Sequence, residues 1–387
     1  MTGAGDRALL PAGLQDLLAP AAAHEAATVE RLIAGFATFG YERVKPPLLE
    51  FEEALLTGAG ASVAQQTFRL MDPVSQRMMA LRADITPQVA RIAATRLAKA
   101  PRPLRLCYGG QVLRIKGTQL RPERQFGQAG AELIGAPEPQ ADAEVVVLAA
   151  DALTRVGVGK LSVDLSQPTL VGSVARGLGY EEARIGALRQ RLDRKDAAGV
   201  AELAGGDGEL FLALLGAAGP AAGALDALSR LALPEAAQAE VAQLARVVAL
   251  VQGAAPELTI TVDPVEHRGF EYQTGVSFTL FARDVRGELG RGGRYVSELP
   301  GNGGESSTGF TLYMDTIMRA LPSLARPHRV YLPAGCPADE GQRLRAEGWI
   351  TLAGFAAADA EGEARRLGCS HLWRDGTIEQ LADGQGD

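Results

Sequence analysis

The sequence predicts an α+β fold, with an antiparallel sheet flanked by helices, a helical insertion and a small C-terminal α/β unit. Three observations support it. Segments of alternating apolar and polar residues recur between residues 41 and 314, as half-buried strands require. Residues 171–252 are almost wholly helical in pattern. After Pro327 strand and helix patterns alternate. We therefore expect a core over residues 1–326, with residues 171–252 inserted, and a second unit over 327–387.

Two N-terminal segments carry helix signals. Residues 24–39 place apolar side chains at helical spacing, and Gly40 follows as a C-cap. A second helix is expected from Thr86, a plausible N-cap, with Pro87 in its first turn. A further apolar helix is expected over residues 142–157.

The strand signals lie between and after these helices. Pro46 and Pro47 exclude helix from the segment after Tyr41 and suit a sheet edge or an interface. A turn at Asp72-Pro73 separates two short strands. The remaining strand patterns are LRLCYGGQVLRI, RQFGQAGAELIG, KLSVDLSQ, LTITVDP, GVSFTLFA and TGFTLYM. The first two should pair antiparallel across a loop over residues 117–123. After Pro327 the pattern is βαβαβ, with right-handed crossovers expected.

Composition favours a reduced, cytoplasmic protein. The 387 residues carry a net charge of −7 and three cysteines, which are far apart and show no metal-ligand spacing. We expect all three cysteines to be buried and no metal to be bound. No secretory h-region or membrane-length apolar run is present.

Two local features have plain structural interpretations. GRGGRY, over residues 290–295, lacks the strand–helix context of a dinucleotide site and is interpreted as a glycine-rich turn. A basic cluster is more often a solvated face than a nucleic-acid site, and its members are Arg102, Arg105, Arg114, Lys116, Arg121 and Arg124.

Five segments, in order, resemble segments of histidyl-tRNA synthetases. They are YERVKPPLLE (41–50), LRADITP (81–87), VLRIKGTQLRPERQFGQAGAELIG (112–135), RGFEYQTG (268–275) and GGRY (292–295). The first is similar to the class II signature whose proline lies at that family's dimer interface. The resemblance covers about residues 9–322 and implies a class II aminoacyl-tRNA synthetase-like fold with a dimeric core.

The resemblance also implies a histidine pocket. Its matched positions are Asp84, Thr86, Arg114, Gln128, Glu132, Arg268 and Tyr272. Asp84 stands where the family has glutamate, and Gln273 replaces the second tyrosine of a pair. Gln128 and Glu132 lie four apart on a strand and should point to one face. The alternative is that these two residues simply pair with neighbouring arginines.

The ATP half of such a site is altered at three positions. Lys116 replaces a glutamate that accepts a bond from adenine, and lysine has only donors. Tyr313 stands where a glycine leaves room for the nucleotide. Thr316 replaces an arginine that stacks on adenine, and threonine offers no planar cation. These losses argue against ATP-dependent activation of an amino acid.

A synthetase-like chain with a histidine pocket and no ATP site resembles the ATP phosphoribosyltransferase regulatory subunits. Their PD-T segment is close to residues 83–86 here. The resemblance implies a non-catalytic protein without cofactor, needed by a short-form catalytic subunit for the first step of histidine biosynthesis and for feedback by L-histidine. We do not expect tRNA to be a partner.

Two alternatives stay open at this point. An active histidyl-tRNA synthetase would carry out histidine-dependent ATP–pyrophosphate exchange, and the three substitutions argue against it. A synthetase-like accessory protein with another partner would share every feature above. Residues 327–387 look short for an anticodon-binding domain, and residues 171–252 are interpreted as a lid or packing module.

Overall fold

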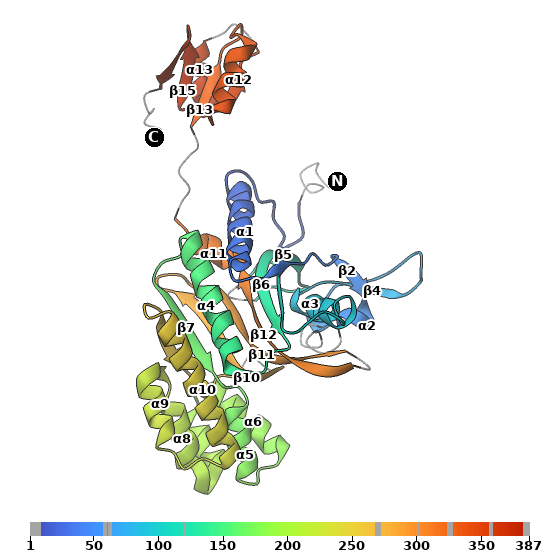
Figure 1. Ribbon diagram of the computed structural model, residues 1–387, viewed down its shortest axis with the longest axis vertical. Coiled ribbons are helices and arrows are strands. Elements are labelled where there is room, and N and C mark those ends of the chain that lie inside the picture. The colour runs from blue at the N-terminus through green and yellow to red at the C-terminus, as the bar shows by residue number, and fades with distance from the viewer. Residues whose placement is uncertain are drawn as a thin grey trace, which may run out of the picture. The chain divides into compact units, whose positions relative to one another are not determined.

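The computed structural model describes most of the chain, which forms two compact units, residues 1–322 and 323–387 (Figure 1). The described residues are 9–56, 60, 64–118, 121–267, 272–299, 302–322, 328–355 and 359–381.

A nine-stranded sheet forms the centre of the first unit. In spatial order its strands are β1 (Glu42–Arg43), β5 (Leu104–Leu113), β6 (Gln125–Ile134), β12 (Asn302–Tyr313), β11 (Gly290–Leu299), β10 (Gln273–Ala282), β7 (Leu161–Ser166), β9 (Thr259–Val262) and β8 (Gly219–Pro220). All neighbouring strands from β5 to β7 are antiparallel. Strand β1 pairs in parallel with β5, and β9 pairs in parallel with β7. The predicted antiparallel sheet is confirmed.

Helices cover one face of this sheet (Figure 1). They include α1 (Ala21–Ala37), α4 (Pro139–Val156) and α10 (Glu235–Ala254). Ala131 and Leu133 of β6 face them and join the main hydrophobic core. The burial of this apolar area, at about 25 cal/mol per Å², holds the helices on the sheet. As predicted, Gly40 lies in the left-handed region after α1, with φ +83°.

On the other face of β6 lies α3 (Thr86–Thr95). Ile85, Val89, Phe126 and Ile134 form a second, smaller core between them. Thr86 was expected to cap α3, and that prediction is wrong. Ile85 holds the N-cap position, and the Thr86 hydroxyl is engaged elsewhere.

A small sheet adjoins α3, with β2 (Leu49–Phe51), β4 (Met78–Leu81) and β3 (Arg69–Met71) in that order. Helix α2 (Glu52–Leu55) follows β2. The predicted turn at Asp72-Pro73 is confirmed, because the Asp72 carboxylate accepts bonds from the backbone of Val74 and Ser75.

The helical insertion lies between β7 and β9. Its helices are α5 (Leu170–Gly177), α6 (Glu182–Asp193), α7 (Ala197–Ala204), α8 (Gly208–Gly216), α9 (Ala221–Ser229) and α10. Their buried faces join the main core. The bounds lie within two residues of the predicted 171–252. The insertion therefore shares its core with the sheet.

GRGGRY is not a turn, contrary to the sequence interpretation. It opens β11, which runs between β10 and β12. A Cβ on Gly292 would collide with the Gly309 carbonyl and with Phe278. The glycines therefore permit close strand packing, which composition alone does not distinguish from a turn.

Helix α11 (Met314–Ala320) follows β12 and ends the first unit. The second unit has a four-stranded sheet with β13 parallel to both of its neighbours. Its elements are β13 (Arg329–Leu332), α12 (Ala338–Ala346), β14 (Ile350–Ala353), α13 (Ala360–Arg366), β15 (His371–Arg374) and β16 (Thr377–Gln380). The βαβαβ pattern is confirmed, with β16 as an added antiparallel strand.

Two remaining expectations concern the cysteines and the membrane. Cys107 and Cys369 are buried as expected, but Cys336 is only partly buried. Among the described residues, no helix combines the length and apolar character needed to cross a bilayer.

Candidate functional site

Glu132 lies at the centre of a buried polar cluster where the start of α3 meets β6. Glu132 is only 1% exposed to solvent. Thr86 Oγ1 donates to one carboxylate oxygen over 2.8 Å, and the Tyr295 hydroxyl donates to the other over 2.9 Å. Three elements far apart in sequence, α3, β6 and β11, thus supply the carboxylate and its donors.

Gln128 forms the second part of the cluster and lies four residues before Glu132 on β6. Its side-chain oxygen accepts the Ile85 N–H at 3.2 Å, and its amide nitrogen donates to Asp84 at 3.3 Å. Asp84 also accepts the Thr86 N–H at 2.9 Å. Gln128 and Glu132 point to the same face, as predicted. In the described contacts neither pairs with an arginine, and their partners are Thr86, Tyr295, Ile85 and Asp84.

Sequence reasoning missed two hydroxyl groups of the cluster, those of Tyr108 and Tyr295, whereas Tyr272 was among the predicted residues. The Tyr108 hydroxyl lies 3.1 Å from Thr86 Oγ1 and 2.8 Å from Thr311 Oγ1. Nothing in the sequence distinguishes Tyr108 from a core residue. Tyr295 ends the GGRY segment, which could have singled it out. The Tyr272 ring lies edge-on to Tyr295 at 6.0 Å between centroids, so Tyr272 joins the cluster.

The environment of Glu132 favours its neutral form. Burial raises the pKa of this carboxyl to about 8, although the hydroxyl donors oppose the shift. Gly309 lies directly opposite Glu132 on β12, and a Cβ there would collide with the carboxylate. The carboxyl group therefore lies directly over the backbone of β12.

Two predicted residues are not among the described members of this cluster. Arg114 Nε donates to the Ala83 carbonyl at 3.3 Å, and its guanidinium lies 5.1 Å from the Phe126 ring centroid. Its carbonyl partner is thus the residue that precedes Asp84, but Arg114 makes no described contact with the Glu132 network. Arg268 lies outside the described residues.

The space beside the cluster at Tyr313 is filled by packed side chains. Tyr313 is buried, its ring meets Phe126 at 6.1 Å, and the Arg121 guanidinium stacks 3.8 Å above it. Asp315 fixes Arg121 through an ion pair of 2.9 Å. Thr316 is buried and accepts a bond from Arg319. A tyrosine, an arginine and an aspartate thus occupy the space beside the end of β12.

The basic cluster is not a solvated face, contrary to expectation. Arg102 pairs with Glu305 at 2.6 Å and Arg105 with Glu144 at 2.8 Å. Arg121 is buried, and Arg114 and Arg124 donate to backbone carbonyls. Lys116 alone among the six residues is exposed. These cations hold structure together, because the buried or half-buried guanidinium groups meet carboxylates and carbonyls.

The fold and the cluster define a class of protein, the class II cores of histidyl-tRNA synthetase type. The family model described as histidyl-tRNA synthetase matches residues 13–317. A solved structure titled as an ATP phosphoribosyltransferase regulatory subunit/histidyl-tRNA synthetase, from Bacillus halodurans, has the same fold. Its TM-score is 0.80 at 24% identity, over 93% of this chain and 96% of that one.

Curated relatives define the particular family. An ATP phosphoribosyltransferase regulatory subunit from Rhodospirillum centenum is 59% identical over 97% of both chains. Another from Gluconobacter oxydans is 45% identical over 97% of both. The chain belongs to the family of ATP phosphoribosyltransferase regulatory subunits. Its role is therefore that of a regulatory subunit, without catalytic activity of its own.

Proposed function

We propose that this chain activates a short-form ATP phosphoribosyltransferase catalytic subunit in the cytoplasm and relays the histidine concentration to it. One observation carries the proposal. The polar cluster around Glu132 holds its donors and acceptors together, while the adjoining space at Tyr313 is closed by Arg121 and Asp315. A chain that holds such a cluster but closes the neighbouring space is suited to sensing a small ligand.

L-Histidine is the ligand that this pocket fits. Glu132 and Asp84 offer carboxylates to an ammonium or imidazolium group, and the hydroxyls of Thr86 and Tyr272 offer further polar contacts. The histidine carboxylate would be met by cations, and we assign Arg114 and Arg268 to that role. Together with Gln128, these are the seven residues of the proposed site.

No catalytic step is assigned to this chain. Transfer of the phosphoribosyl group to ATP takes place on the partner, which catalyses the first committed step toward histidine. A coupling free energy of about 1–3 kcal/mol between histidine binding here and the active arrangement of the partner would change activity roughly 5- to 150-fold. Histidine inhibits only if it favours the less active arrangement.

The chain is proposed to form a dimer through residues 41–50, the segment that is similar to the class II signature, and the small sheet next to it. Apolar side chains are exposed on and beside the small sheet, and they are Leu48, Leu70, Met71, Val74 and Met78. Several exposed apolar side chains on one small sheet are typical of an interface, and they support this proposal. Residues 1–326 are assigned to the synthetase-like core and 327–387 to the added α/β unit.

Ligand binding and exchange assays test the proposal together. Calorimetry is expected to show one histidine per chain, with affinity lost in Glu132→Ala. ATP is expected neither to bind nor to support histidine-dependent pyrophosphate exchange. Glu209→Ala, at an exposed position of α8, is the control and should bind histidine normally. Measurable exchange, or the same histidine affinity in Glu132→Ala, would overturn the proposal.

A further inference from the structure

A polar cavity lies on the same face of the sheet as Glu132. The strand register places Glu132 opposite Gly309, Gly309 opposite Gly293, Gly293 opposite Ser277, and Ser277 opposite Ser166. Residues directly opposite on paired strands point to the same face. One lateral row therefore leads from the Glu132 pocket across five strands to β7.

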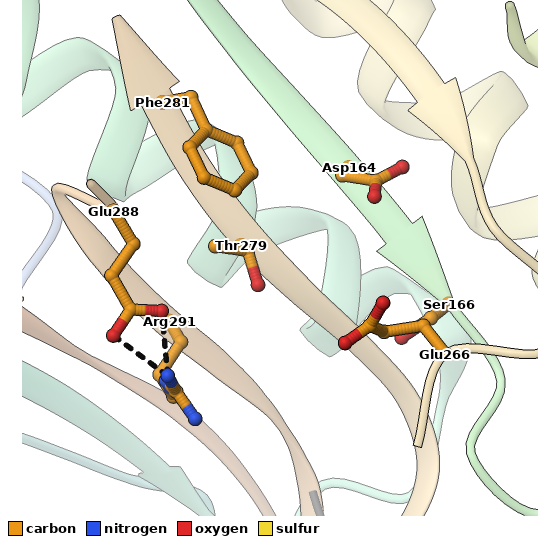
Figure 2. Close-up of a pocket in the computed structure, with 7 residues that line it drawn as sticks. All are labelled: Asp164, Ser166, Glu266, Thr279, Phe281, Glu288 and Arg291. Atoms are coloured by element: carbon orange, nitrogen blue, oxygen red, sulfur yellow. Dashed lines mark hydrogen bonds and ion pairs between the residues drawn. The ribbon is translucent and has the colours of Figure 1, made fainter. Parts of the chain in front are cut away.

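The cavity at the β7 end of this row has a volume of about 120 Å³. Asp164 and Ser166 of β7 line it together with Glu266, Phe281 and the Glu288–Arg291 pair (Figure 2). Since one buried water needs roughly 10–15 Å³ of cavity volume, the cavity has room for several waters or one small molecule.

Its lining carries more negative than positive charge. Arg291 is bound to Glu288 through contacts of 2.7 and 2.6 Å. Among the described residues, the hydrogen-bond donor to Asp164 is the neutral Thr261 hydroxyl at 2.8 Å, and nearby Lys195 is paired with Asp263 at 2.6 Å. Burial raises the pKa of Asp164 and of Glu266, with Asp263 adding repulsion. Both carboxyl groups thus lack a direct cationic partner in the described contacts.

Ser166 supplies an independent sign of a missing ligand. The residue is 2% exposed, and its hydroxyl has no hydrogen-bond partner among the described residues. A buried hydroxyl without a partner is destabilising, so such groups are rare in folded proteins. Ser166 lines the cavity, where a ligand would satisfy its hydroxyl.

We propose that this cavity binds a small organic cation, with a primary ammonium group held by Asp164, Glu266 and the Ser166 hydroxyl. The apolar body of the cation would lie against the Phe281 ring, which is 37% exposed. A metal ion is the less suitable occupant, because no group of three His, Cys, Asp or Glu among the described residues is arranged to hold one. The site is separate from the histidine pocket and does not depend on its proposed role.

The matched probes are benzylammonium and its neutral isostere, benzyl alcohol. Binding is measured by calorimetry at neutral pH, to the full chain, in saturating L-histidine and again in the Glu132→Gln variant, so that the first pocket is not the site observed. Benzylammonium is expected to bind at least about tenfold more tightly than the alcohol in both settings. Equal affinities, no binding, or binding confined to the chain without histidine would overturn the proposal.

Variants locate the binding to the cavity. Glu266→Gln, alone and with Asp164→Asn, should weaken benzylammonium binding about tenfold or more, while Glu209→Gln should not. Unchanged affinity in the folded Glu266→Gln variant overturns the proposal.

Ser166→Ala gives a second test, in which the melting temperature and the affinity for benzylammonium should change in opposite directions. Removing an unpartnered buried hydroxyl should raise the melting temperature, whereas binding of benzylammonium should weaken. A variant that is stabilised and binds benzylammonium normally would show that the hydroxyl has no ligand role, and would contradict the proposal.

Discussion

The Tyr295 hydroxyl donates a hydrogen bond of 2.9 Å to Glu132, although the two residues lie on strands that β12 separates. The bond is possible because Gly309, between them on β12, has no side chain. A glycine on one strand therefore lets a tyrosine and a carboxylate on the strands either side meet.

Tyr295→Phe should weaken histidine binding about tenfold, because Glu132 would lose one of the donors that stabilise its ionised form. Stability should fall by about 1 kcal/mol. Tyr180→Phe is the matched control, since it removes a buried hydroxyl that donates to Ala204 and Asp207 in the insertion. Calorimetry and urea unfolding check both variants. Equal loss of histidine affinity in the two variants would contradict the role of Tyr295.

Glu132 should make stability depend on pH. Its folded pKa, about 8, lies above its ordinary value of 4.5, so the folded state retains a proton that the unfolded state releases. The free energy of unfolding should therefore fall as pH rises from about 4.5 through 8, by a total on the order of 3–5 kcal/mol from this group.

The Glu132→Gln variant tests that pH dependence directly. Glutamine does not titrate, so the difference in unfolding free energy between wild type and variant should change in favour of the variant from pH 5 to pH 8. Urea unfolding at four pH values measures it. Parallel pH profiles would show that Glu132 has no raised pKa.

Gly309→Ala should abolish histidine binding, because the new Cβ would collide with a carboxylate oxygen of Glu132 and crowd the Ala131 carbonyl. Gly253→Ala, in α10, is the contrasting variant. Nothing lies within 4 Å of its added Cβ, so it should stabilise the chain by roughly 0.5–1 kcal/mol. Thermal unfolding and calorimetry separate the two. Normal histidine binding by Gly309→Ala would contradict the pocket geometry.

Arg294 holds β11 to the start of α4 and so positions Tyr295. It pairs with buried Asp142 at 3.0 Å and donates to the carbonyls of Ala136 and Glu138. Arg294→Met should cost about 3–5 kcal/mol, because Asp142 would be left buried without its cation. Arg230→Met, which breaks an exposed pair with Asp226, should cost less than about 0.5 kcal/mol. Urea unfolding that shows similar losses would contradict this role.

Much of the fold was predictable because local patterns agree with it. The Gly40 C-cap and the alternating strands at residues 104–113 and 125–134 are settled by neighbouring residues. Thr86 misled the prediction, since its hydroxyl serves Glu132 on a strand 46 residues away. A side chain with both a local and a distant partner cannot be assigned from sequence alone.

The site was predictable in part for the same reason. Resemblance identified Gln128 and Glu132, and their shared face follows from strand geometry. Tyr108 was missed because its hydroxyl meets Thr86 on α3 and Thr311 on β12, and no local signal reports contacts between such distant segments. The stacking of Arg121 on Tyr313 could not be predicted either, because a contact between a cation and a ring in distant segments leaves no periodic pattern in the sequence.

The central claim is that this chain controls a partner's phosphoribosyltransferase activity in response to histidine. The most direct measurement is phosphoribosyl-ATP formation by the short-form catalytic subunit of the same organism, with and without this chain, titrated with L-histidine. We predict that activity appears only on mixing and falls as histidine rises, with feedback weakened in Glu132→Ala. Equal activity of the catalytic subunit alone and in the mixture would contradict the account.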